Sequence, residues 1–255
     1  MTRILDTVTP SLTHPLVAEA AALTATYAEA SAEAILRFAL LERFRGEVAV
    51  VSSFGAESAV LLHLVASVAP DTPVLFLDTD RHFFQTLSYR KALAAKLGLN
   101  RVVDLYPDAA EVAEQDPKGN LSSTHPDSCC DLRKVRPLAR GLAPYTAWIS
   151  GRKRHQADTR AALPVFEHEG QHFKINPLAA WSPADLTAYA EHHDLPPHPL
   201  VEQGYPSIGC FPCTQPASAE DPRAGRWAGQ SKTECGIHSL QPYRGLGRSD
   251  PLMQS

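Results

Sequence analysis

The chain has 255 residues, of which 44% are hydrophobic and 20% charged, and its net charge at pH 7 is −4. This length supports one large α/β domain with a functional tail. No apolar run approaches the ~20 residues that a membrane-spanning helix needs. The negative charge balance argues against broad binding to nucleic acid or to an anionic membrane surface, so we expect neither as a partner.

Residues 1–46 are predicted to form a helical cover, because residues 15–45 carry two helical patterns. This cover would lie over a sheet edge or against a partner subunit. In the second case the protein would be a homo-oligomer. Residues 1–30 show no basic start followed by a continuous apolar run, so nothing marks the chain for export. We therefore expect a reducing, cytoplasmic setting.

Residues 47–195 are predicted to form a nucleotide-binding α/β domain. Short apolar runs at 47–52, 73–77, 102–105 and 145–150 are typical of buried strands, and a helical pattern over 83–97 ends at Gly98. Alternating strands and helices of this length predict a doubly wound, parallel sheet. Ligands of such sheets bind beyond the carboxyl ends of the strands.

The turn after the first strand is small and polar, and a helical pattern follows it. Serine hydroxyls and free backbone N–H groups at a helix start bind phosphate, although this signal alone is weak. The expected substrate-binding residues on strand ends are Ser52, Ser53, Phe54, Gly55, Glu57, Ser58, Leu77, Asp78, Thr79 and Gly151. Basic residues from distant segments are expected to complete one anionic site, namely Lys134, Arg152, Lys153, Arg154, Arg223 and Arg226.

The later elements are predicted from turn and cap residues. Residues 116–126 form a loop, and the Cys129-Cys130 doublet then opens a helix that runs to about Leu142. Residues 164–175 form a hairpin around Gly170, and Ser182 caps a helix that ends near His193. Residues 196–255 are rich in proline and are predicted to be a C-terminal segment with a mobile tail.

The five cysteines divide into two pairs and one single residue. The doublet and the pair Cys210 and Cys213 supply four sulfur ligands, which select zinc or an iron–sulfur cluster, and Cys235 stays free for chemistry. The sequence does not separate zinc from iron. Buried apolar cysteines or structural disulfides are the alternative, and disulfides fit poorly with a reducing compartment.

The chain resembles the assimilatory adenylyl-sulfate reductase family over most of residues 47–240. The resemblance rests on the two cysteine pairs, the loop at residues 52–58, the strand end Leu77-Asp78-Thr79 and the tail Glu234-Cys235-Gly236-Ile237-His238. The resemblance implies an adenine-nucleotide α-hydrolase-like fold, related to the PP-loop proteins, and a [4Fe-4S] cluster on the four paired cysteines. It implies reduction of adenosine 5′-phosphosulfate to sulfite and AMP, with reduced thioredoxin or glutaredoxin as donor. Lys153 stands where family members often have arginine, and Asp80 where glycine is common.

The predicted mechanism gives catalytic roles to Cys235, His238 and Lys134, with Lys232 as a further cation. Cys235 attacks the sulfur of the phosphosulfate, His238 and Lys232 are cations that favour its thiolate, and Lys134 stabilises the departing phosphate. Reduced thioredoxin then releases sulfite from an S-sulfonate on Cys235.

Three alternatives remain open at this point. The substrate could be the 3′-phosphorylated nucleotide, with the same mechanism. A PP-loop tRNA-thiolating enzyme would share the strand, loop and helix, but Ser53 and Phe54 replace the glycines of its loop. A zinc-stapled binding module would leave Cys235 without a role.

Overall fold

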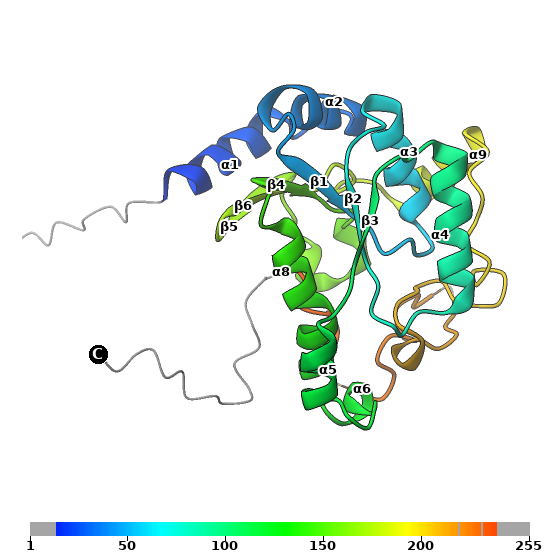
Figure 1. The fold of residues 1–255 in the computed structure, drawn as a ribbon. Helices are drawn as coiled ribbons and strands as arrows, with labels where there is room; N and C mark the ends of the chain where they lie inside the picture. The colour runs from blue at the N-terminus through cyan, green and yellow to red at the C-terminus, as the bar shows by residue number, and fades with distance from the viewer. Residues whose placement is uncertain (1–13, 219, 231, 239–255) are drawn as a thin grey trace, which may run out of the picture.

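The computed structural model describes residues 14–218, 220–230 and 232–238, and its centre is a six-stranded sheet (Figure 1). The strands lie in the order β3-β2-β1-β4-β6-β5 and all pair in parallel except β5, which runs antiparallel to β6. Their bounds are β1 Val48–Val51, β2 Val74–Leu77, β3 Val102–Leu105, β4 Ala147–Ile149, β5 Phe166–Glu169 and β6 His172–Ile175. The doubly wound parallel sheet and the hairpin around Gly170 are confirmed.

The helices surround this sheet, and none in the described part of the chain is long and apolar enough to span a bilayer. The α-helices are α1 Pro15–Thr26, α2 Ala32–Arg37, α3 Ser58–Val68, α4 Phe84–Leu97, α5 Ala109–Gln115, α6 Leu121–Thr124, α7 Pro126–Cys130, α8 Arg136–Leu142 and α9 Pro183–His192. Two π-helical segments, η1 Phe38–Arg43 and η2 Asp131–Val135, and three 3-10 turns, η3 Arg154–Gln156, η4 Asp158–Arg160 and η5 Phe211–Cys213, complete the described elements.

Each face of the sheet has its own hydrophobic core, because successive side chains of a strand point to opposite faces. Along β1, Val48 and Val50 pack in a core with residues of α2, α3, α4 and α9, whereas Ala49 and Val51 face α8. Leu138 and Leu142 of α8 are fully buried against this second face. Burial of each such leucine is worth about 1.5–3 kcal/mol, so α8 is fixed firmly under the sheet.

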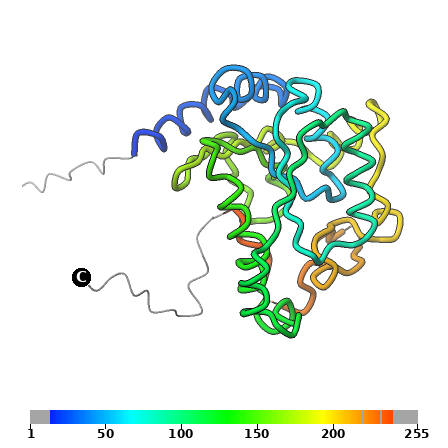
Figure 2. The backbone as a smooth tube through the Cα atoms, viewed as in Figure 1, coloured from blue at the N-terminus to red at the C-terminus, as the bar shows by residue number. Residues whose placement is uncertain are grey.

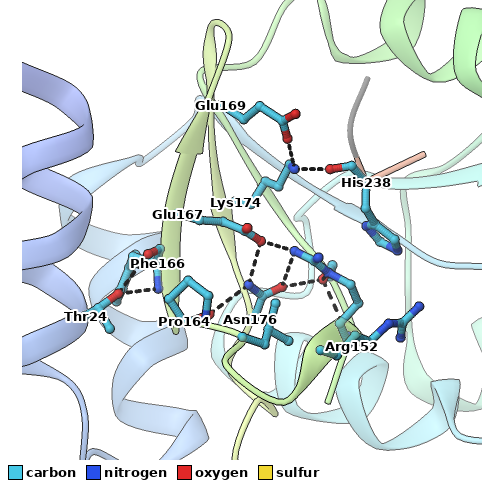
Figure 3. Close-up of polar contacts among 12 residues, drawn as sticks. Thr24, Arg152, Pro164, Phe166, Glu167, Glu169, Lys174, Asn176 and His238 are labelled. Carbon is cyan, nitrogen blue, oxygen red and sulfur yellow. Dashed lines mark hydrogen bonds and ion pairs between the residues drawn. The ribbon is translucent and has the colours of Figure 1, made fainter. Parts of the chain in front are cut away.

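The N-terminal helix α1 covers an edge of the sheet. It packs along β5, and the Thr24 hydroxyl bonds both the N–H and the C=O of Phe166, at 2.9 and 2.8 Å (Figure 3). This contact satisfies backbone groups that an edge strand would otherwise expose.

The helix of the cysteine doublet differs from the prediction at its start and in its middle. It begins at Pro126, so Cys129 and Cys130 end its first segment rather than open it. The helix then widens to π spacing over Asp131–Val135, where the Arg136 N–H bonds the carbonyl of Asp131. Pro137 follows and has no N–H for the regular ladder, which accounts for the wider turn.

The expected loop over residues 116–126 contains the single-turn helix α6. The carboxylate of Asp116 accepts the Leu121 N–H at 3.0 Å and so caps this turn. From residue 196 onward, the described chain has one 3-10 turn and one isolated bridge, between Thr214 and Arg226. Its yellow-to-orange trace folds back below α4, toward α6 (Figure 2).

Candidate active site

A cavity of about 580 Å³ lies at the carboxyl ends of β1 and β4. The chain moves outward from β1 to β2 and β3 and then returns to add β4 on the other side of β1. Such a switch in strand order is where open α/β sheets bind ligands. The volume is also typical of a small-molecule site.

The polar turn after β1 forms one wall of the cavity. Ser52, Ser53, Gly55, Glu57 and Ser58 line it, and Ser58 is the first residue of the 11-residue helix α3. The helix start directs free N–H groups and the positive end of its dipole toward this wall. The wall is therefore suited to a phosphate.

Phe54 does not line the cavity, although the sequence placed it among the substrate contacts. Its side chain is fully buried against Phe76, with ring centroids 5.7 Å apart, and its backbone has a φ of +48°. The Phe54 N–H donates to the Ser52 hydroxyl at 3.2 Å. Phe54 thus anchors the turn in the core and leaves ligand contacts to its neighbours.

The end of β2 is divided between two environments. Leu77 lines the cavity, whereas Asp78 and Thr79 do not. The Thr79 hydroxyl lies 3.3 Å from Sγ of Cys210, and Oδ1 of Asp78 accepts the Asp80 N–H at 3.2 Å. Asp80 has a φ of +56°, in the region that favours glycine.

Two of the three basic residues after β4 are already paired with carboxylates. Gly151, Arg152 and Lys153 line the cavity, where Arg152 pairs with Glu167 and Lys153 with Glu57. Burial opposes the charge of Glu57, but attraction to Lys153 and hydrogen bonds outweigh it and lower the pKa of this carboxyl.

Arg154 turns away from the cavity. Its Nε donates to the carbonyl of Leu163 at 3.0 Å, so the side chain fastens a loop instead of facing a ligand.

Arg160 lines the cavity and was missed by the sequence analysis. It donates from Nε and Nη2 to the two carboxylate oxygens of Glu234, both at 2.8 Å. Arg223, which was expected, lies 3.7 Å from the same carboxylate and donates to the Thr233 carbonyl at 2.8 Å. No sequence pattern marks Arg160, because it reaches the site only through the fold of residues 151–163.

The Cys235 segment, defined here as residues 232–238, lies along the cavity. Cys235 itself lines the cavity together with Glu234, Ile237 and His238. Ile237 packs against the α8 face of the sheet, and Gly236 turns the chain with a φ of +82°. The structure therefore brings the single cysteine next to the strand ends, as its predicted role requires.

His238 is not the cation that the sequence analysis expected. Its side chain is half-buried at the cavity wall, and its ring stacks on Trp148, with centroids 5.7 Å apart and planes 6° from parallel. Burial first, and then the positive charges of Arg152 and Arg160, hold the pKa of His238 well below its ordinary value. His238 is therefore neutral at pH 7.

Lys232 was also expected to be a cation that favours the thiolate of Cys235. Its ammonium group pairs with the carboxylate of Asp127 instead.

Lys134 lies between the large cavity and a second, smaller one, and lines both. Burial opposes its charge, but attraction to the thiolate forms of Cys210, Cys235 and Cys130 outweighs burial and raises the pKa of Lys134. Lys134 is thus a cation that faces the cysteines of both sites. Arg226 likewise lines the large cavity, stacked on Trp227 at 4.5 Å.

The smaller cavity is lined by all four paired cysteines, Cys129, Cys130, Cys210 and Cys213. Cys129 and Cys130 end α7, whereas Cys210 immediately precedes η5 and Cys213 ends it. The short helix α6 contacts both α7 and η5. Burial raises the pKa of Cys129 to about 11 and that of Cys130 to about 12. No group of three or more His, Cys, Asp or Glu within the described ranges is arranged to hold a single metal ion. Four thiols around one small cavity are the donor set of a sulfur-ligated group.

The comparisons with known proteins agree with this geometry. The profile of the phosphoadenosine phosphosulfate reductase domain matches residues 47–216. Adenosine 5′-phosphosulfate reductase from Mesorhizobium japonicum is 54% identical over 224 residues, which are 88% of this chain and 88% of the relative.

Two solved structures extend the comparison. Phosphoadenylyl-sulfate reductase from Candida auris, crystallised as a phosphate complex, matches with a TM-score of 0.67 and 27% identity, over 80% of this chain and 98% of that chain. FMN adenylyltransferase from Candida glabrata, with a TM-score of 0.52, 15% identity and coverage of 86% and 87%, shares the fold alone. Because the domain profile matches residues 47–216 and the Mesorhizobium relative is 54% identical, this chain belongs to the phosphoadenosine phosphosulfate reductase family.

Proposed function

We propose that this chain reduces adenosine 5′-phosphosulfate to sulfite and AMP, with reduced thioredoxin as the electron donor. The name of the Mesorhizobium relative supports this substrate. The observation that carries the proposal is the presence of Cys235 in one cavity with Lys134, Arg160 and Arg223. A free thiol among cations suits attack on an anionic substrate.

The nucleotide is expected to bind across the ends of β1 and β4. Its phosphate lies at the turn formed by residues 52–58, where the start of α3 offers N–H groups. The sulfate end then points toward Lys134 and the Cys235 segment, because these line the same cavity. The 3′-phosphorylated substrate remains an alternative, supported by the likeness to the Candida auris reductase.

The first chemical step forms an S-sulfonate. The thiolate of Cys235 attacks the sulfur of the phosphosulfate and a new S–S bond forms. The bond between this sulfur and the oxygen that bridges it to phosphorus breaks. AMP leaves with the electron pair of that bond. Lys134 and Arg160 stabilise the charge that grows on the leaving phosphate, and this is worth most in a partly closed cavity.

The second step returns the enzyme. A thiolate of reduced thioredoxin attacks Sγ of Cys235, sulfite leaves with the pair of the S–S bond, and a mixed disulfide remains. The second thiol of thioredoxin resolves this disulfide and restores Cys235. Both electrons come from the dithiol, and glutaredoxin could supply them in the same way.

Cys129, Cys130, Cys210 and Cys213 are the residues that would hold a [4Fe-4S] cluster, since they line one small cavity. When bound, such a cluster would tie η5 to α7 and add its charge beside Lys134. Zinc is the competing occupant of four thiolates. Metal analysis with a visible absorption spectrum separates the two, because a zinc protein is colourless.

The test of the proposed function is sulfite production from each of the two nucleotides, with reduced thioredoxin and, in parallel, reduced glutaredoxin. We expect sulfite from adenosine 5′-phosphosulfate. Sulfite from the 3′-phosphorylated nucleotide alone would overturn the substrate assignment, and no sulfite from either would overturn the reaction.

A further inference from the structure

Lys174 is a lysine in the middle of a buried strand, with 1% of its surface exposed. An ammonium group in such a place is costly unless its charge and its N–H donors are matched. Lys174 has two such partners, the carboxylate of Glu169 and the backbone carbonyl of His238 (Figure 3). Lys174 therefore joins the hairpin β5–β6 to the Cys235 segment.

The hairpin divides its two carboxylates between two cations. Glu167 and Glu169 lie two residues apart on β5 and so point to the same face. Glu167 pairs with Arg152, which lines the cavity, whereas Glu169 pairs with Lys174, which does not. Lys174 is thus placed to act on the Cys235 segment without touching a ligand in the cavity.

The contact with His238 is reinforced by stacking. Nζ of Lys174 lies 5.7 Å from the centre of the Trp148 ring, and the His238 ring stacks on that same tryptophan. His238 is three residues after Cys235, and Glu234, which Arg160 binds, is one residue before it. The reactive cysteine is therefore held on both sides.

We propose that Lys174 is a positioning residue, which holds the Cys235 segment over the cavity through the His238 carbonyl and is itself held by Glu169. The inference rests on the proposed function in that Cys235 is taken as the nucleophile. Withdrawal of the segment leaves a buried ammonium donor without its carbonyl, so the segment is favoured in its place over the cavity. Formation of the S-sulfonate needs this placement, whereas attack by thioredoxin needs Cys235 accessible.

The variant Lys174→Met tests this, because methionine keeps the length of the side chain and removes the donor and the charge. Single-turnover mixing with adenosine 5′-phosphosulfate, followed by intact mass, measures S-sulfonate formation. We expect formation to be about tenfold slower, the size of effect for one hydrogen bond to a charged group. Release of sulfite from the preformed S-sulfonate by reduced thioredoxin is expected to be unchanged or faster, and the Kd for AMP unchanged.

Two further variants separate positioning from a loss of folding. Glu169→Gln keeps Lys174 in place but weakens its support, so it should slow S-sulfonate formation by less than Lys174→Met does. Thr24→Val removes the bonds that hold the outer strand of the same hairpin and should leave both half-reactions at the native rates. Thermal unfolding of all three reports any general destabilisation.

The inference is overturned if Lys174→Met forms the S-sulfonate at the native rate, or if it slows both half-reactions alike. If the native chain forms no S-sulfonate, the proposed function fails, and the placement of the segment is then tested by alkylation of Cys235. Iodoacetamide with peptide mapping should label Cys235 several-fold faster in Lys174→Met than in Thr24→Val. Equal labelling would contradict the role of Lys174 independently of the reaction.

Discussion

The guanidinium group of Arg160 binds both carboxylate oxygens of Glu234, at 2.8 Å from Nε and 2.8 Å from Nη2. This two-pronged geometry is the strongest that an arginine makes with a carboxylate. It holds the residue next to Cys235 and, at the same time, neutralises a cation that faces the cavity. An anionic ligand that enters the cavity must therefore share Arg160 with Glu234.

Glu234→Gln should tighten the binding of AMP. The glutamine keeps the size of the side chain but no longer competes as an anion for Arg160 and Arg223, and we expect the Kd to fall about fivefold, or ~1 kcal/mol. Isothermal titration calorimetry measures this. The matched control is Glu220→Gln, whose carboxylate lines the same cavity but bonds Ser218. A Kd that does not fall in Glu234→Gln would show that the two anions do not compete.

Arg160→Lys should weaken AMP binding and raise KM. Lysine is a point charge, so it cannot offer two parallel N–H donors to a phosphate as arginine does. We expect a loss of about tenfold in kcat/KM. Arg154→Lys is the control, since Arg154 lies only a few residues earlier in the chain and bonds the Leu163 carbonyl outside the cavity. Steady-state kinetics on both variants gives the comparison, and equal losses would argue against a special role for Arg160.

Cys130→Ser should lose iron and the visible absorbance of a cluster, since Cys130 is one of the four thiols on the small cavity. Cys235→Ser should keep both, because Cys235 lines the large cavity instead. Iron and acid-labile sulfide assays on the purified variants measure this. Loss of colour in Cys235→Ser would mean that the division of the five cysteines is wrong.

His198 should make the fold sensitive to acid. Its Nδ1 accepts the Leu200 N–H at 3.1 Å, Nε2 lies 3.1 Å from the Thr86 hydroxyl, and burial lowers the pKa of His198 to about 4. The unfolded chain protonates this histidine near its ordinary value of 6.5, so the unfolded state binds more protons between pH 6.5 and 4. The stability that His198 contributes is therefore complete above pH 6.5 and is lost as the pH falls toward 4.

Urea unfolding at pH 7.5, 6.0 and 5.0 measures this effect on the native chain and on His198→Gln. The variant should be less stable at pH 7.5 and should lose less stability on acidification. Parallel curves for the two proteins would assign the acid sensitivity to other groups.

The sheet could be predicted from the sequence because four of its strands are short apolar runs, and the structure has these four within two residues of the predicted bounds. The division of the cysteines followed from their spacing: the four paired cysteines line the small cavity, whereas Cys235 lines only the large one, which Cys210 also reaches. These features are local in the chain. The π turn after the doublet was not predicted, although Pro137 two residues beyond it was a visible signal.

The charge states at the site could not be predicted, because they depend on residues that only the fold brings together. The pKa of His238 is lowered first by burial and then by the positive charges of Arg152, Arg160 and Lys174, so this histidine is neutral. Lys174 itself lies in a strand pattern, where a lysine is usually taken as solvent-facing. Its ammonium group can be buried because it pairs with the carboxylate of Glu169 on the other strand of the hairpin.

The central claim is that Cys235 carries the transferred sulfonate. The most direct measurement is intact-protein and peptide mass spectrometry after incubation with adenosine 5′-phosphosulfate in the absence of thioredoxin. The account predicts one added SO3 group on the peptide that contains Cys235, which disappears when reduced thioredoxin is added. An unmodified Cys235, or a sulfonate on any of the other four cysteines, would contradict it.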